Sequence, residues 1–450
     1  MRQSMNDSPK IDWAKGDALG LEFPAHGDAL RQGGAEWLTR AFRASGALGP
    51  EASVTRITQC DSFVAGGTGT KLLLAVEFDQ ASDLPSDLFV KFSRNFADLA
   101  RDNARFHMAA EVRLANLSRD PAFPIAVPRC LYADFEESSG TGVLITARIP
   151  YGQNGVEPHL PKCMEHLLPD APGHYRANLT ALARLAGAHK AGRLGAAVER
   201  YFPLDLPGMI AADRNPYDRR RLTTRVDRLA QFVADHPQLF PAALSKPDFL
   251  ARLRADAPRF LEAEEAIKRF LHAEPDLIAL CHWNANIDNG WYWRDAQGRL
   301  TCGLIDWGSV GQLHLAMSLW GCLSGAEPEI WEDEFDGLID LFMVEYAAAG
   351  GPTLDRDTLL LHLELYVMMM GLAWLIDAPA RIHLDIADPA VLTSARDPGL
   401  NDHEMARVQL KMSANMLGLW QRRDSGRLLR EGGAFGPDAL ASLACATPSL

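Results

Sequence analysis

The spacing of the apolar residues changes near residue 150 and divides the chain into two parts. Before it, strand-like runs lie at 53–60, 71–78, 88–92, 127–135 and 143–149, with one helical segment at 106–117. After it, helical periodicity is found at 175–190, 218–236, 247–271 and from 313 onward, interrupted by a strand-like hairpin at 290–306. Strands that precede helices in this way are typical of an α+β protein. We therefore predict two lobes, residues 1–150 and 151–450.

Both ends of the chain are expected to be loosely structured. Residues 1–30 are rich in Gly, Pro, Asp and Ser, and the first expected helix is at 34–44. From about Arg423 the sequence is Gly-rich, which favours a tail. Within the helical part, Asp218 is expected to cap the N-terminus of its helix.

Composition excludes several classes of function. Lys plus Arg number 45 and Asp plus Glu 58, and the net charge of −13 disfavours general nucleic-acid binding. Seven cysteines, none in a Cys-x-x-Cys pair, favour free thiols in a reducing cytosol. The polar N-terminus has no apolar signal segment. The longest apolar run, 365–376, is shorter than the ~20 residues that a spanning helix needs. We expect a cytoplasmic protein without a membrane or nucleic-acid partner.

Three features of the first lobe could bind phosphate groups. Gly66, Gly67 and Gly69 lie in a turn between two strands, where bare N–H groups can approach phosphate oxygens, although a tight hairpin would need the same residues. Lys91 lies in an apolar strand, so its ammonium needs either a charged partner or solvent at a sheet edge. Glu111, on the following helix, could be that partner or a solvated surface residue.

The second lobe carries a polar loop followed by an acidic residue. Five of the eight residues from His282 to Asn289 are polar, directly after an apolar run at 277–280. Asp306 follows another apolar strand. A carboxylate close to the amide oxygen of Asn289 would be a pair of hard oxygen donors of the kind that suits Mg²⁺.

The order of these motifs resembles the aminoglycoside phosphotransferase and choline kinase-like superfamily, whose members have the protein-kinase-like fold. His282 and Asn289 match the ends of that family's His-Gly-Asp-x-x-x-x-Asn loop. Ile305-Asp306-Trp307 matches its Ile-Asp-Trp or Ile-Asp-Phe motif. The resemblance covers about residues 35 to 350, and the segment 37–69 is similar to the ecdysteroid-kinase-like branch.

The resemblance implies a bilobal fold with a small antiparallel sheet in one lobe and a large, mainly helical lobe. It also implies binding of ATP with Mg²⁺ and transfer of the γ-phosphoryl group to a small-molecule hydroxyl. The implied ligands of the phosphates are Gly66, Gly67, Gly69 and Lys91, with Glu111 paired to the lysine, and those of the metal are Asn289 and Asp306. The segment 146–149, which contains Ala147, would be the hinge that contacts adenine.

One position departs from the family pattern. Asn284 occupies the place of the catalytic aspartate, and Trp283 replaces the preceding glycine. An amide cannot take a proton from a hydroxyl. Three interpretations remain: transfer in which Asn284 orients the hydroxyl and Asp288 or a substrate group accepts the proton, nucleotide binding without catalysis as in a pseudokinase, or nucleotidyl transfer. His282 could carry a proton or organise the loop. Transfer remains possible without a base because positioning and electrostatics dominate phosphoryl transfer. Since the residues implied to bind the phosphates and the metal are all retained, we favour an ATP-dependent phosphotransferase.

Overall fold

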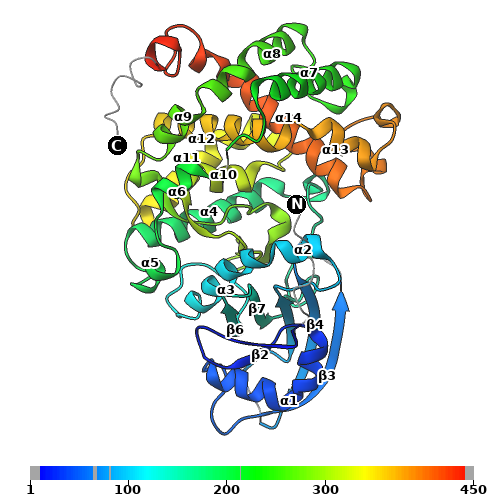
Figure 1. Ribbon diagram of the computed structural model, residues 1–450, viewed down its shortest axis with the longest axis vertical. Coiled ribbons are helices and arrows are strands. Elements are labelled where there is room, and N and C mark those ends of the chain that lie inside the picture. Colours follow the sequence, from blue (N-terminus) through cyan, green and yellow to red (C-terminus); the bar gives the residue numbers. More distant parts are fainter. Residues whose placement is uncertain (1–10, 64–67, 81–82, 213, 441–450) are drawn as a thin grey trace, which may run out of the picture. The chain divides into compact units, whose positions relative to one another are not determined.

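The computed structural model describes residues 11–63, 68–80, 83–212 and 214–440, which form two compact units (Figure 1). The first unit comprises Met1–Asn154, Leu194–Phe202 and Gly303–Val310, and the second comprises Gly155–Arg193, Pro203–Cys302 and Gly311–Leu450. The predicted boundary near 150 lies close to the first crossing of the chain at Asn154. Because two later segments return to the first unit, Asp306 belongs to that unit.

The first unit is built on an antiparallel sheet of five strands in the order β3-β4-β5-β7-β6. The strands are β3 (Val54–Phe63), β4 (Thr70–Phe78), β5 (Asp87–Phe92), β6 (Cys130–Glu136) and β7 (Thr141–Ala147). Each corresponds to a predicted run. Alternate residues of β4 and β5, such as Leu72 and Val90, are buried in one apolar core, which leaves Lys71 and Lys91 on the opposite face of the sheet.

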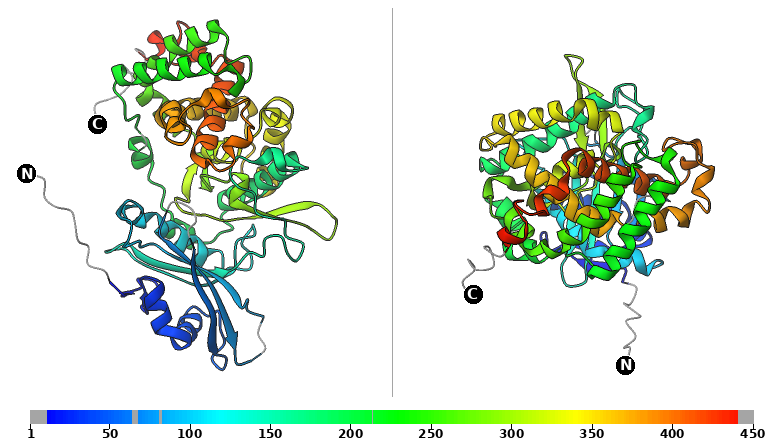
Figure 2. Two further views of the ribbon diagram at one scale, coloured as in Figure 1. Left: turned by 90° about the vertical axis from the view of Figure 1, so that its right-hand side faces the viewer. Right: turned by 90° about the horizontal axis from the view of Figure 1, so that it is seen from above.

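Helix α1 (Gly27–Ala44) covers the apolar face of this sheet, as Figure 2 shows in dark blue. It is preceded by the paired strands β1 (Trp13–Lys15) and β2 (Glu22–Pro24). Phe23 and Trp37 are fully buried, and the indole Nε1 of Trp37 donates to the carbonyl of Glu22 at 2.8 Å. The prediction that residues 1–30 form a loose segment is therefore wrong from residue 13 onward. Strands of three residues are too short to show a period in the sequence.

Helix α3 (Met108–Leu117) packs on the other face of the sheet, through Val112 and its neighbours against β6 and β7. It follows α2 (Leu99–Asn103) and the 3₁₀ turn η1 (Arg105–His107), and the short α5 (Ala197–Tyr201) contacts it. The returning segment 303–310 is attached to this unit by a β-bridge between Ala126 and Gly303. A hydrogen bond from Leu304 N to Ala126 O, 3.1 Å long, extends this attachment. This attachment places Asp306 on the lysine-bearing side of the sheet, as its contact with Lys91 shows.

The second unit is mainly helical. Its helices are α4 (Ala171–Lys190), α6 (Leu206–Ala211), α7 (Arg219–Asp235), α8 (Pro247–Glu262), α9 (Glu264–Leu271), α10 (Leu315–Leu323), α11 (Phe335–Ala348), α12 (Arg356–Met370), α13 (Ala378–Asp385) and α14 (Glu404–Arg423). Asp218 caps α7 as predicted, accepting a bond from Arg221 N at 2.8 Å. The predicted helix 247–271 is two helices, because the chain turns at Ala263 and buries Glu264, which accepts a bond from Asn215 N.

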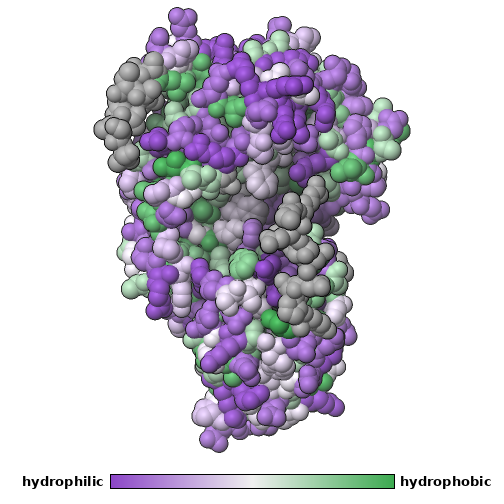
Figure 3. Space-filling model, in the orientation of Figure 1, coloured by the Kyte–Doolittle hydropathy of each residue, from purple (hydrophilic) through white to green (hydrophobic). Residues whose placement is uncertain are grey.

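Two pairs of strands complete the second unit. Strand β8 (Ile278–Cys281) pairs with β11 (Gly311–His314), a strand that the sequence pattern did not reveal. Strands β9 (Gly290–Arg294) and β10 (Leu300–Leu304) form the predicted hairpin, closed by a bond from Asp295 N to Arg299 O, and the last two residues of β10 belong to the first unit. The surface over α7 and α8 is mostly hydrophilic (Figure 3), as expected for helices whose charged side chains face solvent.

The C-terminal segment is part of the packed structure, and the prediction of a tail from about Arg423 is wrong. A 3₁₀ helix, η10 (Ser425–Leu429), follows α14, and Leu428 is buried. Arg423 and Arg427 both donate to Glu364, at 2.7 and 3.0 Å. Because Glu364 is fully buried in α12, it needs these charged partners, and they fix the C-terminal segment in place.

Helix α12 continues into the π-helical turn η7 (Gly371–Leu375) and so reaches 20 residues, Arg356–Leu375. By length and composition it could cross a membrane, which corrects the expectation drawn from the shorter run 365–376. However, 67% of its most apolar stretch is buried inside the protein, and it carries the ion-paired Glu364. Its apolar character is explained by its packing in the core of the second unit.

Candidate functional site

A buried ion cluster surrounds Lys91 in the first unit. Its Nζ donates to Glu111 Oε2 at 2.6 Å and to Asp306 Oδ1 at 3.3 Å. Lys91 lies on the central strand β5, and both it and Glu111 are buried, so the alternatives of a sheet-edge lysine and a solvated glutamate do not apply. Burial alone would lower the pKa of Lys91, but the attraction of Glu111 and Asp306 outweighs it and raises the pKa. The ammonium is thus held charged between two acids.

A second lysine, Lys71, stands directly opposite Lys91 on β4. It is buried, and its Nζ donates to Thr68 O at 2.7 Å. Burial, together with the neighbouring Lys91 charge, lowers the pKa of Lys71 to about 8. Lys71 was not among the predicted site residues, although it follows the glycine turn closely in the sequence. The register that places it opposite Lys91 depends on two strands and is not contained in the sequence of one.

Asp306 lies on a backbone that ordinary residues rarely adopt. Its φ is +61°, and half of its side chain (51%) is exposed. The indole of the buried Trp307 fixes the next residue by donating to Leu304 O at 2.9 Å. Left-handed backbone at a residue other than glycine costs on the order of 1–3 kcal/mol and is concentrated at functional sites. From this backbone the carboxylate of Asp306 accepts the bond from Lys91.

Of the three predicted phosphate-binding glycines, Gly66 and Gly67 lie outside the described residues. Gly69 has φ +60°, and a Cβ there would lie 1.9 Å from the carbonyl oxygen of Phe92. Only glycine therefore fits where the turn enters β4. At the predicted hinge, Ala147 N donates to Arg129 O at 2.8 Å and Arg148 N donates to Asp87 O at 3.0 Å, so neither N–H is available to an adenine.

The polar loop 282–289 belongs to the second unit and is held from two sides. Asn178 of α4 donates to Ala285 O at 3.0 Å. At Gly321 of α10, a Cβ would lie 2.0 Å from Trp283 O, so the helix touches the loop backbone directly. His282 is fully buried, and its Nδ1 accepts a bond from Asn284 N at 3.0 Å. This is the geometry of a histidine that organises the loop backbone.

The side-chain amide of Asn284 has a fixed orientation. Gly325 N can only donate, and it bonds to Asn286 Oδ1 at 3.1 Å. The Nδ2 of Asn286 therefore faces Asn284 Oδ1, to which it donates at 2.7 Å. Lys162 Nζ, also a donor only, bonds to the same oxygen at 3.3 Å. The acceptor atom of Asn284 is thus used internally, and its Nδ2 donates to no group in the described part of the chain.

Asn289 and Asp288 differ in what they offer. Asn289 Nδ2 donates to Asn284 O at 2.7 Å, which leaves its Oδ1 without a partner among the described residues and fit to bind a metal. Asp288 faces Lys162 at 3.8 Å, and burial raises the pKa of Asp288 although Lys162 opposes it. Asn289 lies in the second unit and Asp306 in the first. Within the residues described, no three His, Cys, Asp or Glu side chains gather as a metal site.

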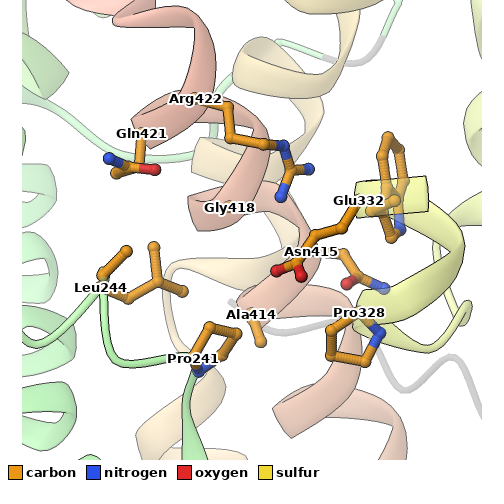
Figure 4. A pocket seen from close by; sticks show the side chains of 11 residues that line it. Pro241, Leu244, Pro328, Glu332, Ala414, Asn415, Gly418, Gln421 and Arg422 are labelled. Carbon is orange, nitrogen blue, oxygen red and sulfur yellow. The ribbon is translucent and has the colours of Figure 1, made fainter. Parts of the chain in front are cut away.

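A separate pocket of about 60 Å³ lies elsewhere in the second unit (Figure 4). It is lined by Pro241, Leu244, Pro328 and residues of α14 that include Asn415 and Arg422. The amide of Asn415 is committed to two carbonyls at 2.8 Å, those of residues 324 and 326. None of the predicted site residues lines this pocket.

Comparison with known proteins gives likenesses of structure only. No protein-family model matches the chain, and no curated protein does. Among solved structures, an aminoglycoside 2′-phosphotransferase in complex with GDP is 14% identical over 81% of this chain and 94% of its own, with a TM-score of 0.41. An ethanolamine kinase from Plasmodium vivax is 11% identical over 82% and 83%, with a TM-score of 0.41. A macrolide 2′-phosphotransferase is 13% identical over 84% and 96%, with a TM-score of 0.34.

These three proteins are of the kind that the sequence motifs resemble. The α+β fold with a small antiparallel sheet and many helices is established by the structure of the chain itself.

Proposed function

We propose that the protein uses ATP with Mg²⁺ to phosphorylate an oxygen atom of a small molecule, the hydroxyl group being the acceptor that its motifs imply. The observation that carries this proposal is the position of Lys91 between two carboxylates, Glu111 at 2.6 Å and Asp306 at 3.3 Å. One acid suffices to neutralise a buried lysine. The second, half-exposed and on strained backbone, is suited to serve a ligand as well.

The first unit supplies the groups that would bind the nucleotide. Lys71 and Lys91 are opposite each other on neighbouring strands, and together they offer two cationic donors to phosphate oxygens. Gly69 itself lies against the end of β5, where a Cβ would meet the carbonyl oxygen of Phe92. Asp306 and Asn289 each offer a hard oxygen for Mg²⁺, which would neutralise charge that develops on the phosphates.

The second unit supplies the loop that would position the acceptor. Asn284 would orient the acceptor by donating a hydrogen bond from Nδ2. Without a base at this position, transfer to a hydroxyl would lose roughly 10²–10⁴-fold in rate. Positioning and electrostatics would still provide most of the acceleration, because phosphoryl transfer has a loose transition state.

Calorimetric titration with ATP and Mg²⁺ tests the nucleotide site directly. Lys91→Met should abolish measurable binding, because it removes the cation that faces the phosphates. The matched control is Lys246→Met, a solvent-exposed lysine before α8, which should bind as the unmodified protein does. Equal ATP affinity in folded Lys91→Met and Lys246→Met proteins would contradict the proposal.

A second candidate function is nucleotide binding without transfer, and the orientation of Asn284 favours it. The two are separated by labelled ATP. Release or transfer of the γ-phosphate supports a phosphotransferase, transfer of labelled AMP supports a nucleotidyl transferase, and binding without movement of either label supports a pseudokinase-like binding protein.

A further inference from the structure

The loop at Asn284 presents a hydrogen-bond donor where phosphorylation of an alcohol needs an acceptor. The Oδ1 of Asn284 is occupied by Asn286 Nδ2 at 2.7 Å and by Lys162 Nζ at 3.3 Å, so Nδ2 is the group left to face a ligand. A hydroxyl nucleophile must lose a proton, and neither Nδ2 nor the ammonium of Lys162 can accept one. Two hydrogen-bond donors, Asn284 Nδ2 and Lys162 Nζ, instead suit an acceptor oxygen that carries no proton at neutral pH.

A buried arginine lies next to Lys162. Lys162 forms an ion pair with Asp288 at 3.8 Å. Arg407 is buried, and its guanidinium donates to three carbonyl oxygens, one of them that of Lys162 at 2.8 Å. No carboxylate lies within ion-pair distance of Arg407 in the described ranges. Arg407 therefore places a second cation next to Lys162.

The other charges of this region nearly cancel. Glu327 is paired with Lys411 and with Arg396, whose Nε lies at 2.9 Å. Glu165 is buried with both oxygens unpartnered, and burial raises its pKa to about 7, which removes part of its charge at neutral pH. Glu404 lies near Asp288 at the start of α14. Four acids, Asp288, Glu327, Glu329 and Glu404, stand against four cations, Lys162, Arg396, Arg407 and Lys411, so the region is close to neutral and the orientation of the Asn284 amide is what favours an acceptor without a proton.

We propose that the acceptor of the phosphoryl group is a carboxylate, held by Asn284 Nδ2 and Lys162 Nζ, and that the product is an acyl phosphate. This inference rests on the proposed ATP-dependent transfer and replaces the hydroxyl that the motifs imply with a carboxylate as the acceptor. One carboxylate oxygen attacks the γ-phosphorus of ATP, the bond from that phosphorus to the β–γ bridging oxygen breaks, and ADP leaves with the electron pair. No proton is gained or lost, so the absence of a base at position 284 has no cost.

The experiment measures ADP release with Mg²⁺ and matched acceptors: acetate, butyrate, octanoate, benzoate and 3-phenylpropanoate against ethanol, butanol, octanol, benzyl alcohol and 3-phenylpropanol. Hydroxylamine traps any acyl phosphate as a hydroxamate. With at least one carboxylate, we expect ADP release at least ~100-fold faster than with the matched alcohol, together with formation of the hydroxamate. This factor is the smallest rate loss that the absence of a general base should cause for an alcohol. Alcohols that outperform their carboxylates, or a panel without any carboxylate-dependent ADP release, would overturn the inference.

Asn284→Asp is the informative variant, because Lys162 and Asn286 can donate to a carboxylate oxygen as they do to the amide, so the loop should keep its structure. It should lower carboxylate turnover by at least ~10-fold through like-charge repulsion and raise alcohol turnover by supplying a base. Lys162→Met should raise KM for the carboxylate. If both variants leave the acceptor preference unchanged, the inference is wrong.

Calorimetry with ATP and Mg²⁺ separates the two failures. Binding of ATP without preference for a carboxylate would refute only the acceptor class. If the unmodified protein does not bind ATP, the proposed function and the inference are both refuted.

Discussion

Replacing Glu111 with glutamine should destabilise the first unit by about 2–4 kcal/mol, because it leaves a buried ammonium with one partner. Removing one partner of a buried ion pair costs ~3–5 kcal/mol. At an effective dielectric of about 20, charges at 2.6 Å attract by roughly 6 kcal/mol and at 3.3 Å by roughly 5 kcal/mol, for Glu111 and Asp306 respectively. Water screens the half-exposed Asp306, so it can compensate only part of the loss.

The measurement is hydrogen exchange of peptides from β5 and α3 as a function of urea, which reports the unfolding free energy of the first unit. The control is Glu77→Gln, which removes an ion pair of the same 2.6 Å length with Arg56 but at an exposed site. It should change stability far less. Lys91→Met combined with Glu111→Gln should be more stable than Glu111→Gln alone, because no unpaired charge remains. Equal effects of Glu111→Gln and Glu77→Gln would refute the reasoning.

Three further outcomes are expected. The affinity for ATP should fall as the pH rises through about 8, because Lys71 loses its proton there, and Lys71→Ala should flatten this pH profile in calorimetry; an unchanged profile would count against a role for Lys71. Gly69→Ala should lower the melting temperature more than Gly46→Ala, since both have positive φ but only the Cβ at position 69 would meet a backbone oxygen, that of Phe92 at 1.9 Å; equal shifts would disprove the contact. The unfolding free energy of the second unit should fall by about 2 kcal/mol between pH 7 and pH 5. Burial lowers the pKa of His362 from 6.5 to about 4, so the unfolded chain takes up a proton before the folded chain does. In urea titrations at the two pH values His362→Gln should reduce this fall, and an equal fall in the variant would contradict the assignment to His362.

The strands and the central chemistry could be predicted because their signals are local. Alternation in β4 and β5 is set by the two-residue period of a strand, and it places Lys91 on the face opposite the apolar core. A lysine within an apolar strand needs an acid, and the helix after the strand carries Glu111. This pairing is what the resemblance implied, and the structure contains it at 2.6 Å.

The errors concern segments whose stability comes from distant partners. Residues 13–24 contain two strands of only three residues each, too short to show a period, yet Phe23 is fully buried beneath α1. The Gly-rich segment after Arg423 is ordered because Arg427 reaches Glu364, 63 residues earlier in the chain. Composition does not indicate whether such a segment is ordered, because the contacts that hold it are made with other elements.

The sequence by itself determined the α+β fold, the strands of the sheet, and the chemical identity of the side chains, above all that residue 284 has an amide and no carboxylate. Only the tertiary structure decided which neighbours those side chains have. Lys71 stands opposite Lys91 through strand register, and Asp306 joins the first unit because the chain returns to it at Gly303. The amide of Asn284 is oriented by Gly325, 41 residues later, acting through Asn286. The physical reason is that hydrogen bonds and ion pairs depend on distance and direction in space, which a linear pattern does not contain.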